Sequence, residues 1–588
     1  MGNFPSASRL WLQALEAVSF IERDSALTLG GVLNDLANRY GTAVALIDDE
    51  ETLSYRGLAE RANRYANWAR AEGLAPGATI ALLMRNCADY VAIWAGLSQA
   101  GCTVALINTN LGQGALAHAI RTASAAALIV ETELQDNIAP LLPELPPLRI
   151  WRHGAGESAW PRADLAAAAA SAARPPPLQE AYGTPALLIY TSGTTGLPKA
   201  ANVSHARILQ WSYWFAGLMN TQASDRLYNC LPMYHSTGGV SAIGAMLVNG
   251  GSVYIRRRFS AQRFWSEIVE SEATIFQYIG ELCRYLLHAA PHELETRHRL
   301  RLCCGNGLRE EVWRGFEARF RIPRIIEFYA MTEGAISLYN CEGRPGAVGR
   351  VPGFLAHRFP VALVRCDPET GNLIRDETGR CIPCAAGESG EALGRLDAMS
   401  ASPARRFEGY TDTTLSGTKL AQGVFSAGDL WYRSGDLMRR DNDGFYYFVD
   451  RLGDAFRWKG ENISASEVAS VISSCPGVVD AIAFGVHIPG QEGRAGMAAI
   501  AAEPGFDPAM LRRHVHENLP PYARPVFIRL CASIARTGTF KLSAGTLTAE
   551  GYRGADIAQL WFDDSASQAY IPCSLELLDE IESDRLRL

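Results

Sequence analysis

The sequence contains no hydrophobic run long enough to cross a membrane. No stretch approaches the roughly 20 consecutive apolar residues of a transmembrane helix, and residues 1–20 lack the basic start and apolar centre of a signal peptide. We therefore expect a cytoplasmic protein without a transmembrane segment. Weak peripheral contact with a membrane stays open.

The sequence also lacks an excess of positive charge and a framework of paired cysteines. The formal net charge is -7, so we expect no nucleic-acid partner. The dense basic stretch Arg256-Arg257-Arg258 reads as a solvated face, with an anchor for a phosphate group or for an anionic membrane as alternatives. The 13 cysteines are scattered in the manner of reduced thiols, and Cys381 and Cys384 have no second pair at zinc spacing.

The length and the pattern of apolar residues predict an α/β protein with more than one domain. A chain of 588 residues exceeds the size of an ordinary single core. From Leu27 onward, helical and strand patterns alternate, as in strand 79–84, a helix that begins near Asp89, and strand 103–107. Such alternation is typical of a largely parallel sheet covered by helices.

One run of hydroxyls and glycines lies between two apolar segments that read as strands, 186–189 and 200–203. Its glycines let backbone N–H groups converge on an anion, its hydroxyls add donors, and its lysine adds a positive charge. It is not a Walker loop, because Pro198 precedes the lysine and Ala200 follows it. A flexible linker is the alternative, but this is poor linker composition. We predict a triphosphate-binding loop formed by Thr191, Ser192, Gly193, Thr194, Thr195, Gly196 and Lys199.

Two later segments carry candidate pocket residues. Large apolar residues at helical spacing in 207–218 favour a core-facing helix, and the alternative is that Trp211, Trp214 and Phe215 wall a pocket for an apolar substrate. His235 lies in a glycine-rich turn after a short strand, where its ring is free to face a ligand.

The ends of two further strands suit a nucleotide. An apolar strand runs into Gly305, Asn306 and Gly307, where the backbone can approach a flat base closely. The next strand ends in a segment that contains Tyr329, Thr332 and Glu333. An aromatic ring, a hydroxyl and a carboxylate at this edge suit adenine stacking, phosphate contact and Mg²⁺ ligation.

The loop at 190–199 resembles the phosphate loop of the adenylate-forming superfamily, which comprises acyl-CoA synthetases, peptide-synthetase adenylation domains and luciferases. Longer segments resemble its very-long-chain acyl-CoA synthetase and fatty acid transport protein branch, in a bacterial-type soluble form. The similarity runs from about residue 28 to about residue 550, with the motifs in family order. These segments are Val104–Leu111, Phe259–Trp265, Tyr278–Leu287, Gly305–Arg309 and Phe445–Ile463.

The resemblance implies two domains within the α/β class. Residues 1–452 would form a large domain of parallel-rich sheets layered with helices that binds ATP and the acid. Residues 453–588 would form a small mobile α+β domain that rotates about Gly453 and carries a catalytic lysine. The small domain has its own local signals, because Ser464 to Glu467 reads as a capping box and 478–486 and 497–501 read as strands.

The resemblance also implies roles for single residues. Tyr329 would stack on adenine beside Gly305 to Gly307, Thr332 would bind phosphate, and Glu333 would carry Mg²⁺. Asp436 matches the carboxylate that holds the ribose hydroxyls, and Arg451 matches the arginine at the domain junction. His235 would contribute to catalysis and, with the aromatic residues of 207–218, to an acyl pocket.

Two more family positions lie in the small domain. Lys541 matches the lysine that bridges the substrate carboxylate and the α-phosphate, where charge accumulates in the transition state. Lys459, Gly460 and Glu461 resemble the loop that lines the tunnel for the pantetheine arm of CoA.

The expected reaction is ATP-dependent activation of a fatty or other hydrophobic acid to acyl-AMP, with release of pyrophosphate, followed by transfer to CoA. The expected cofactors are ATP, Mg²⁺ and CoA. Two alternatives stay open: transfer to another acceptor, such as a carrier-protein thiol or an amine, and a non-catalytic protein for fatty-acid binding or uptake. Retention of Lys199, Glu333, Asp436 and Lys541 favours an enzyme.

The chain departs from the family pattern at a few positions. Ala330 replaces the usual glycine after the stacking tyrosine, and the bulk of Trp211, Tyr213 and Trp214 suggests a shorter or flatter acid than a very long chain. Neither the identity of the acid nor the oligomeric state follows from the sequence.

Overall fold

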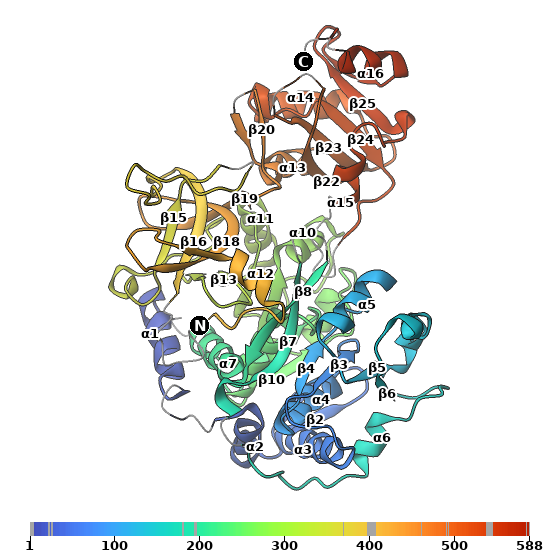
Figure 1. Cartoon of the computed structure of the whole chain (residues 1–588), viewed down its shortest axis with the longest axis vertical. Helices are drawn as coiled ribbons and strands as arrows, with labels where there is room; N and C mark the ends of the chain where they lie inside the picture. Colours follow the sequence, from blue (N-terminus) through green and yellow to red (C-terminus); the bar gives the residue numbers. More distant parts are fainter. Residues whose placement is uncertain are drawn as a thin grey trace. The chain divides into compact units, whose positions relative to one another are not determined.

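A computed structural model describes residues 5–21, 24, 27–178, 181–192, 197–367, 370–396, 407–459, 461–489, 491, 493–536, 545–583 and 585–586 (Figure 1). The chain forms two compact units. The first comprises Met1–Phe359 and Arg395–Leu420, and the second comprises Pro360–Gly394 and Ala421–Leu588.

The first unit contains a six-stranded sheet in the order β6 (Arg149–His153), β5 (Ala127–Glu131), β3 (Thr79–Leu83), β4 (Thr103–Leu106), β7 (Pro185–Ser192) and β8 (Pro198–Ser204). Neighbouring strands run parallel except β7 and β8, which are antiparallel. The predicted strands at 79–84 and 103–107 are therefore confirmed. The helices of this part are α2 (Leu29–Tyr40), α3 (Tyr55–Ala71), α4 (Ala88–Gln99), α5 (Gln113–Thr122) and α6 (Ala163–Ala168).

The other sheet of this unit has eight strands, in the order β14 (Ser337–Asn340), β13 (Ile325–Ala330), β12 (Leu302–Asn306), β11 (Ile275–Ile279), β9 (Arg226–Asn229), β10 (Ser252–Ile255), β1 (Val44–Ile47) and β2 (Thr52–Ser54). Only the two edge strands pair antiparallel with their neighbours. The accompanying helices are α7 (His205–Met219), α8 (Ala242–Leu247), α9 (Phe264–Glu270), α10 (Gly280–His288), α11 (Glu310–Phe320) and α12 (Thr413–Thr418). The predicted architecture of parallel-rich sheets layered with helices is confirmed.

An N-terminal helix, α1 (Ala7–Val18), completes the core of the first unit. Its Trp11 is fully buried and meets Trp214 of α7 edge to face, with ring centroids 5.7 Å apart. The close approach requires glycine at 217, because a Cβ there would lie 2.6 Å from the Cα of Ala14. Burying one such aromatic side chain contributes about 2 kcal/mol to the free energy of unfolding.

The second unit contains two five-stranded sheets and a hairpin. The first sheet comprises β15 (Val361–Val364), β16 (Ser389–Leu396), β17 (Leu420–Gln422), β18 (Leu430–Arg440) and β19 (Tyr446–Arg451), and the hairpin comprises β20 (Phe456–Trp458) and β21 (Glu461–Ile463). The C-terminal sheet comprises β22 (Val478–Val486), β23 (Ala495–Ala502), β24 (Phe527–Cys531), β25 (Leu560–Asp564) and β26 (Ala569–Pro572). Its helices are α13 (Ala465–Ser473), α14 (Pro508–Asn518), α15 (Gly545–Glu550) and α16 (Leu575–Glu582).

Local signals in the C-terminal part are confirmed. The N–H of Glu467 donates to the Ser464 side chain at 3.1 Å, as a capping box requires, and β22 and β23 match the predicted strands. The sheet that ends at Arg451 belongs to the second compact unit, whereas we predicted a boundary after residue 452. The division into compact units does not show which part of the chain rotates. The predicted boundary of the rotating domain, after residue 452, therefore stays a prediction.

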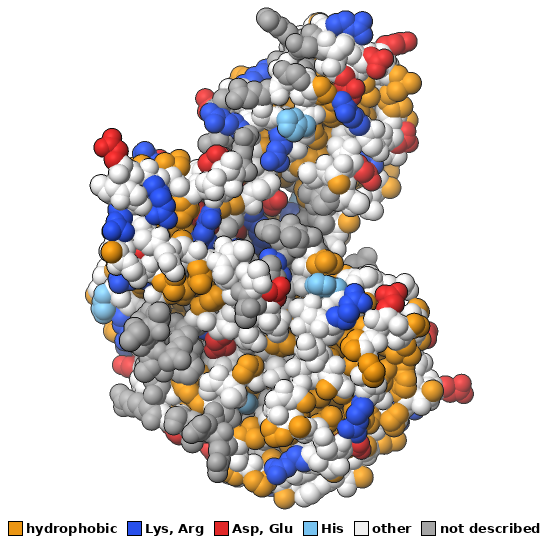
Figure 2. All heavy atoms as spheres, viewed as in Figure 1, with side chains coloured by type: hydrophobic (Ala, Val, Ile, Leu, Met, Phe, Trp, Pro, Cys, Tyr) orange, Lys and Arg blue, Asp and Glu red, His pale blue; other side chains and the backbone are white. Residues whose placement is uncertain are grey.

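Two further properties concern the surface. Within the described ranges, no helix is both long and apolar enough to span a bilayer. On the face seen in Figure 2, Lys and Arg side chains are interspersed with Asp and Glu side chains.

A buried acid–base group joins the end of β6 to the start of α4. His153 Nε2 lies 2.6 Å from Asp89 Oδ2, and the Tyr65 hydroxyl donates to the same oxygen at 2.6 Å. Burial alone would lower the pKa of His153, but its hydrogen bond and charge interaction with Asp89 outweigh burial and raise it. Burial alone would raise the pKa of Asp89, and these partners lower it instead. The interactions therefore favour an imidazolium–carboxylate pair.

We expect His153→Gln to lower the stability of the protein more at low pH than at high pH. A histidine with a raised pKa stabilises the fold below its unfolded pKa of about 6.5, and this contribution is lost as pH rises through the folded pKa. The loss should be about 1–3 kcal/mol at pH values of about 6. Thermal unfolding of both proteins at about pH 6 and about pH 9 measures it.

The control is His118→Gln, which removes a histidine whose ring contacts Thr122 on α5. An equal loss of stability by His153→Gln at both pH values would contradict a charged pair.

Candidate active site

The predicted phosphate loop joins β7 to β8. These strands pair antiparallel, with Thr191 opposite Lys199. Both side chains are half-buried. The predicted strands on both sides of the loop are confirmed, and β7 and β8 extend into the predicted loop as far as Ser192 and Pro198. Residues Gly193 to Gly196 and the side chain of Ser192 lie outside the described part of the chain.

The predicted adenine loop follows β12, and a buried carboxylate fixes it. Glu327 of β13 accepts hydrogen bonds from the backbone N–H groups of Gly307 and of Leu308, the latter at 3.1 Å. The Tyr278 hydroxyl donates to its other oxygen. Gly305 must be glycine, because a Cβ there would lie 2.2 Å from the carbonyl oxygen of Tyr278.

Glu327 is a functional candidate that the sequence reasoning missed. Its signal in the sequence is a single charged residue inside the apolar strand 325–328. Burial raises the pKa of Glu327 to about 8, against the opposing effect of its hydrogen bonds with Tyr278 and the two N–H groups. The carboxyl group therefore titrates close to physiological pH.

The segment that contains Tyr329, Thr332 and Glu333 begins at the end of β13. Tyr329 and Ala330 still pair with β14, and their side chains are half-buried and exposed, respectively. Thr332 is half-buried. Glu333 is only 6% exposed, and the hydroxyl of Tyr410 donates to its Oε1. A buried carboxylate whose orientation is fixed by a hydrogen bond can act as a ligand for a cation.

Tyr410 belongs to a segment that we name the strap, residues 407–411, which lies along β8. The N–H of Asn202 donates to the Gly409 carbonyl at 3.0 Å, and the N–H of Thr411 donates to the Ala200 carbonyl at 3.0 Å. Ser204 donates to Glu408 from its N–H at 2.8 Å and from its hydroxyl at 2.6 Å. The sequence reasoning missed the strap, because its partners on β8 lie about 200 positions away in the sequence.

His235 lies in the predicted turn after β9. Its ring packs against Tyr234, with centroids 4.7 Å apart, and is half-buried. Asn110 donates to the Tyr234 hydroxyl at 3.1 Å. Asn86 holds the same loop, because it donates to the Leu231 carbonyl at 2.8 Å and accepts from the Met233 N–H.

The aromatic residues of α7 pack mostly as core. Trp214 contacts Tyr339 and Phe359 in addition to α1, with ring centroids 5.6 and 5.5 Å away. Phe215 meets Phe328 of β13 at 4.9 Å, and Trp211 is half-buried. This packing favours the core reading for Trp214, and the acyl pocket stays a prediction.

The reading of the three arginines as a solvated face is wrong for Arg256. Its side chain is 9% exposed, lies 2.8 Å from Glu267 and also pairs with Asp49. Arg257 pairs with Glu131, and Arg258 is exposed. The error arose because Asp49 and Glu131 come from distant parts of the sequence, and Glu267 lies eleven positions later on helix α9.

The remaining predicted site residues belong to the second unit. Asp436 of β18 and Arg451 of β19 are cross-strand neighbours, with 3.6 Å between Oδ1 and Nε. Gly453 has a φ of +96°, a conformation that favours glycine. Lys459 and Glu461 are exposed. Gly460 and Lys541 lie outside the described residues.

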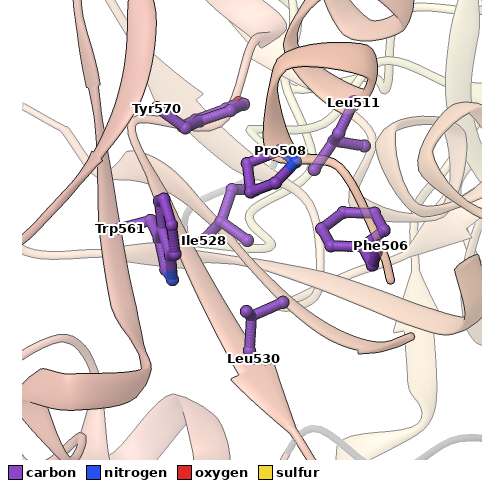
Figure 3. Close-up of a pocket in the computed structure, with 7 residues that line it drawn as sticks. All are labelled: Phe506, Pro508, Leu511, Ile528, Leu530, Trp561 and Tyr570. Atoms are coloured by element: carbon purple, nitrogen blue, oxygen red, sulfur yellow. The ribbon is translucent and has the colours of Figure 1, made fainter. Parts of the chain in front are cut away.

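A shallow apolar hollow that does not admit a water molecule lies on the C-terminal sheet. Figure 3 shows its lining, which contains no carboxylate, cation or thiol, and the Tyr570 hydroxyl already donates to the Pro525 carbonyl at 3.1 Å. The hollow therefore offers no group for phosphate or carboxylate chemistry. Its lining residues are Phe506, Pro508, Leu511, Ile528, Leu530, Trp561 and Tyr570.

Comparison with known proteins finds two family profiles in the chain. The profile of the AMP-binding enzyme matches residues 33–392, and that of the AMP-binding enzyme C-terminal domain matches residues 467–541. The mouse (Mus musculus) long-chain fatty acid transport protein 1 is 38% identical over 93% of this chain and 86% of its own length. The medium/long-chain-fatty-acid–CoA ligase FadD6 of Mycobacterium tuberculosis is 36% identical over 96% of this chain and 92% of its own length.

Solved structures share the fold at lower identity. The anthranilate CoA ligase AuaEII in complex with anthranoyl-AMP superposes with a TM-score of 0.76 at 22% identity, over 89% of this chain and 97% of that one. The Mycobacterium tuberculosis fatty acyl CoA synthetase superposes with a TM-score of 0.63 at 22% identity, over 89% and 98%. The predicted adenylate-forming fold is confirmed, and the chain belongs to the family of AMP-binding enzymes.

Proposed function

We propose that this enzyme activates a hydrophobic carboxylic acid with ATP and transfers the acyl group to CoA. In the first step a carboxylate oxygen attacks the α-phosphorus and pyrophosphate leaves; in the second the CoA sulfur attacks the acyl carbon and AMP leaves. The observation that carries the proposal is the similarity to a medium/long-chain-fatty-acid–CoA ligase along 96% of the chain. The acid is therefore proposed to be a medium- or long-chain fatty acid.

The geometry of the first unit supports a nucleotide site. Glu327 holds the N–H groups of Gly307 and Leu308, so the loop proposed to receive adenine is organised before the base arrives. Tyr329 would stack on the base, and Thr191 and Lys199 would contact phosphates. Preorganised donors of this kind lower the barrier because they need no rearrangement as charge develops.

A magnesium ion is part of the proposal, and the residues present fit it. Mg²⁺ is usually held by one or two carboxylates together with substrate phosphates and water. Glu333 is a buried carboxylate oriented by a hydroxyl, and it would hold the ion. The ion would neutralise phosphate charge, and Thr332 would bind phosphate directly.

The second unit would supply the remaining groups. Asp436 would accept hydrogen bonds from both ribose hydroxyls, and Arg451 Nε lies 3.6 Å from its Oδ1. Lys541 would bridge the acid and the α-phosphate. Rotation about Gly453, with residues 1–452 and 453–588 as the moving parts, would then bring Lys459 to Glu461 to the pantetheine arm.

Two alternatives to this reaction stay open. Some relatives carry names of fatty acid transport proteins, which favours uptake or binding as a second candidate function. A carrier-protein thiol or an amine could also replace CoA as the acceptor. Because ATP and CoA are both found in the cytoplasm, the proposal assigns the enzyme to that compartment.

The acid panel is the first test. Pyrophosphate release from ATP and Mg²⁺ should require an acid, and the matching acyl-CoA should appear in mass analysis only when CoA is added. Release without a thioester would favour another acceptor. The absence of release with every medium- and long-chain acid would contradict the proposed ligase.

Lys541→Ala should slow adenylation by about 10²-fold or more, because one preorganised charge at the α-phosphate would be removed. Thioester formation from pre-made acyl-AMP should be spared. The two half-reactions are measured separately with the same protein preparation. Equal loss of both would remove Lys541 from the proposed role.

Glu327→Gln should abolish one component of the pH dependence of stability. An acid whose pKa is raised to about 8 binds a proton in the folded state that the unfolded state has lost, so wild-type stability falls between its unfolded pKa of about 4.5 and about 8. The slope is at most about 1.4 kcal/mol per pH unit. Unfolding midpoints of both proteins across this range measure it, and parallel curves would contradict the assignment.

A further inference from the structure

The strap contacts both Glu333 and strand β8, which carries Lys199. Tyr410 donates a hydrogen bond to Glu333, the carboxylate proposed to bind the metal ion. The backbone of Gly409 and Thr411 forms hydrogen bonds with Asn202 and Ala200 on β8, the strand that contains Lys199. The strap therefore links the end of the phosphate loop to the carboxylate that follows β13.

The strap is anchored by a buried charge pair. Glu408 Oε1 lies 3.2 Å from Arg207 Nε, and the two side chains are 13% and 2% exposed. Ser204 adds two hydrogen bonds to the same carboxylate. If the strap moved away, Arg207 would be left as an uncompensated buried charge, which is energetically unfavourable. The pair therefore holds the strap in place.

Arg207 also supports the loop that carries Glu333. A Cβ on Gly334 would lie 1.5 Å from Nη1 of Arg207, so the guanidinium fills the space that a side chain at 334 would need. Gly334 also has a φ of +75°, which a residue with a side chain rarely adopts. Arg207 therefore packs against the backbone beside Glu333 and also pairs with Glu408 of the strap.

We propose that Tyr410 is a positioning residue for the divalent cation that accompanies ATP. Its hydroxyl fixes the rotation of the Glu333 carboxylate, so that the second oxygen of this carboxylate can bind the cation. The strap then ties this orientation to β8. The inference rests on the proposed function, because it takes Glu333 as the ligand of the cation.

The size of the effect follows from the behaviour of other metal sites. Removing a hydrogen-bond partner of a metal ligand typically weakens metal binding by about 10–100-fold. Tyr410 is 5% exposed, so water does not readily replace its hydroxyl. A purely structural role of the hydroxyl would lower stability but would not depend on the metal.

The experiment is calorimetric titration of the full-length protein with ATP, without acid or CoA, once with Mg²⁺ and once with EDTA. Tyr410→Phe should weaken binding of ATP with Mg²⁺ by about tenfold or more, while binding of ATP in EDTA stays unchanged. Glu333→Gln should abolish the strengthening by Mg²⁺. Adding Tyr410→Phe to Glu333→Gln should then have little further effect, because both changes act on the same ion.

Tyr55→Phe is the matched control. The Tyr55 hydroxyl is also buried and donates to the carbonyls of Leu247 and Gly251, at 3.0 and 2.7 Å. This variant removes the same atom from a site without the proposed ion. The ratio of the two ATP affinities, with and without Mg²⁺, should stay at the wild-type value.

The outcomes distinguish failure of the positioning role of Tyr410 from failure of the proposed function. If wild type responds to Mg²⁺ through Glu333 and Tyr410→Phe behaves as wild type, the positioning role is wrong and the proposed function stands. If wild type does not bind ATP, the proposed function fails, and the inference fails with it. If wild type binds ATP but Glu333→Gln keeps the full Mg²⁺ effect, only the role of Glu333 and the inference built on it fail. If Tyr410→Phe does not fold, Ser204→Ala, which removes one hydrogen bond to Glu408 and keeps the ion pair of Glu408 with Arg207, replaces it with the same expected selective loss.

Discussion

Two buried carboxylates near the end of β13 are the constraint on which the first unit's site depends. Glu327 and Glu333 are each almost inaccessible to solvent, and each accepts a hydrogen bond from a tyrosine hydroxyl. Burying a carboxyl group is unfavourable unless its oxygens are satisfied. The fold must therefore hold Tyr278 and Tyr410 in fixed positions. The same hydrogen bonds hold the loops that follow β12 and β13.

The layered sheets make these positions rigid. β12 and β13 run parallel, so the loop after Asn306 and the segment after Ala330 emerge at the same edge of the sheet. Asn86 follows β3 of the other sheet and holds the loop that carries His235. Candidate residues from both sheets are thus attached to strand ends rather than to long loops, which gives the precision that a catalytic site needs.

Sequence reasoning was successful for several local signals. The strands on both sides of the predicted phosphate loop, the N-cap at Ser464 and the strands 478–486 and 497–501 depend on neighbouring residues, and all of them are confirmed. The roles assigned to single site residues from family resemblance stay predictions.

The residues that were missed or misread depend on distant partners. Glu333 and Tyr410 are 77 positions apart, and Ser204 and Glu408 are 204 positions apart. Arg256 looked solvated because its partner Asp49 comes from a segment 207 positions earlier, and its other partner Glu267 lies on helix α9, eleven positions later. Periodicity and composition describe one segment at a time, so neither can reveal such pairs. Helix α1 was missed as well, although its signals are local: the Ser6 side chain accepts a hydrogen bond from the Arg9 N–H, and Leu10, Trp11 and Ala14 form one buried face.

The groups proposed to carry out the reaction are divided between the two compact units. The groups proposed for adenine and phosphate belong to the first unit, and those proposed for ribose and the pantetheine arm belong to the second. Gly453 has a positive φ, yet a Cβ there would meet no atom within 4 Å, so only the backbone conformation requires glycine at this position. A residue constrained by conformation rather than by packing can change its dihedral angles without disrupting neighbours. That freedom is what a rotation between two half-reactions would need.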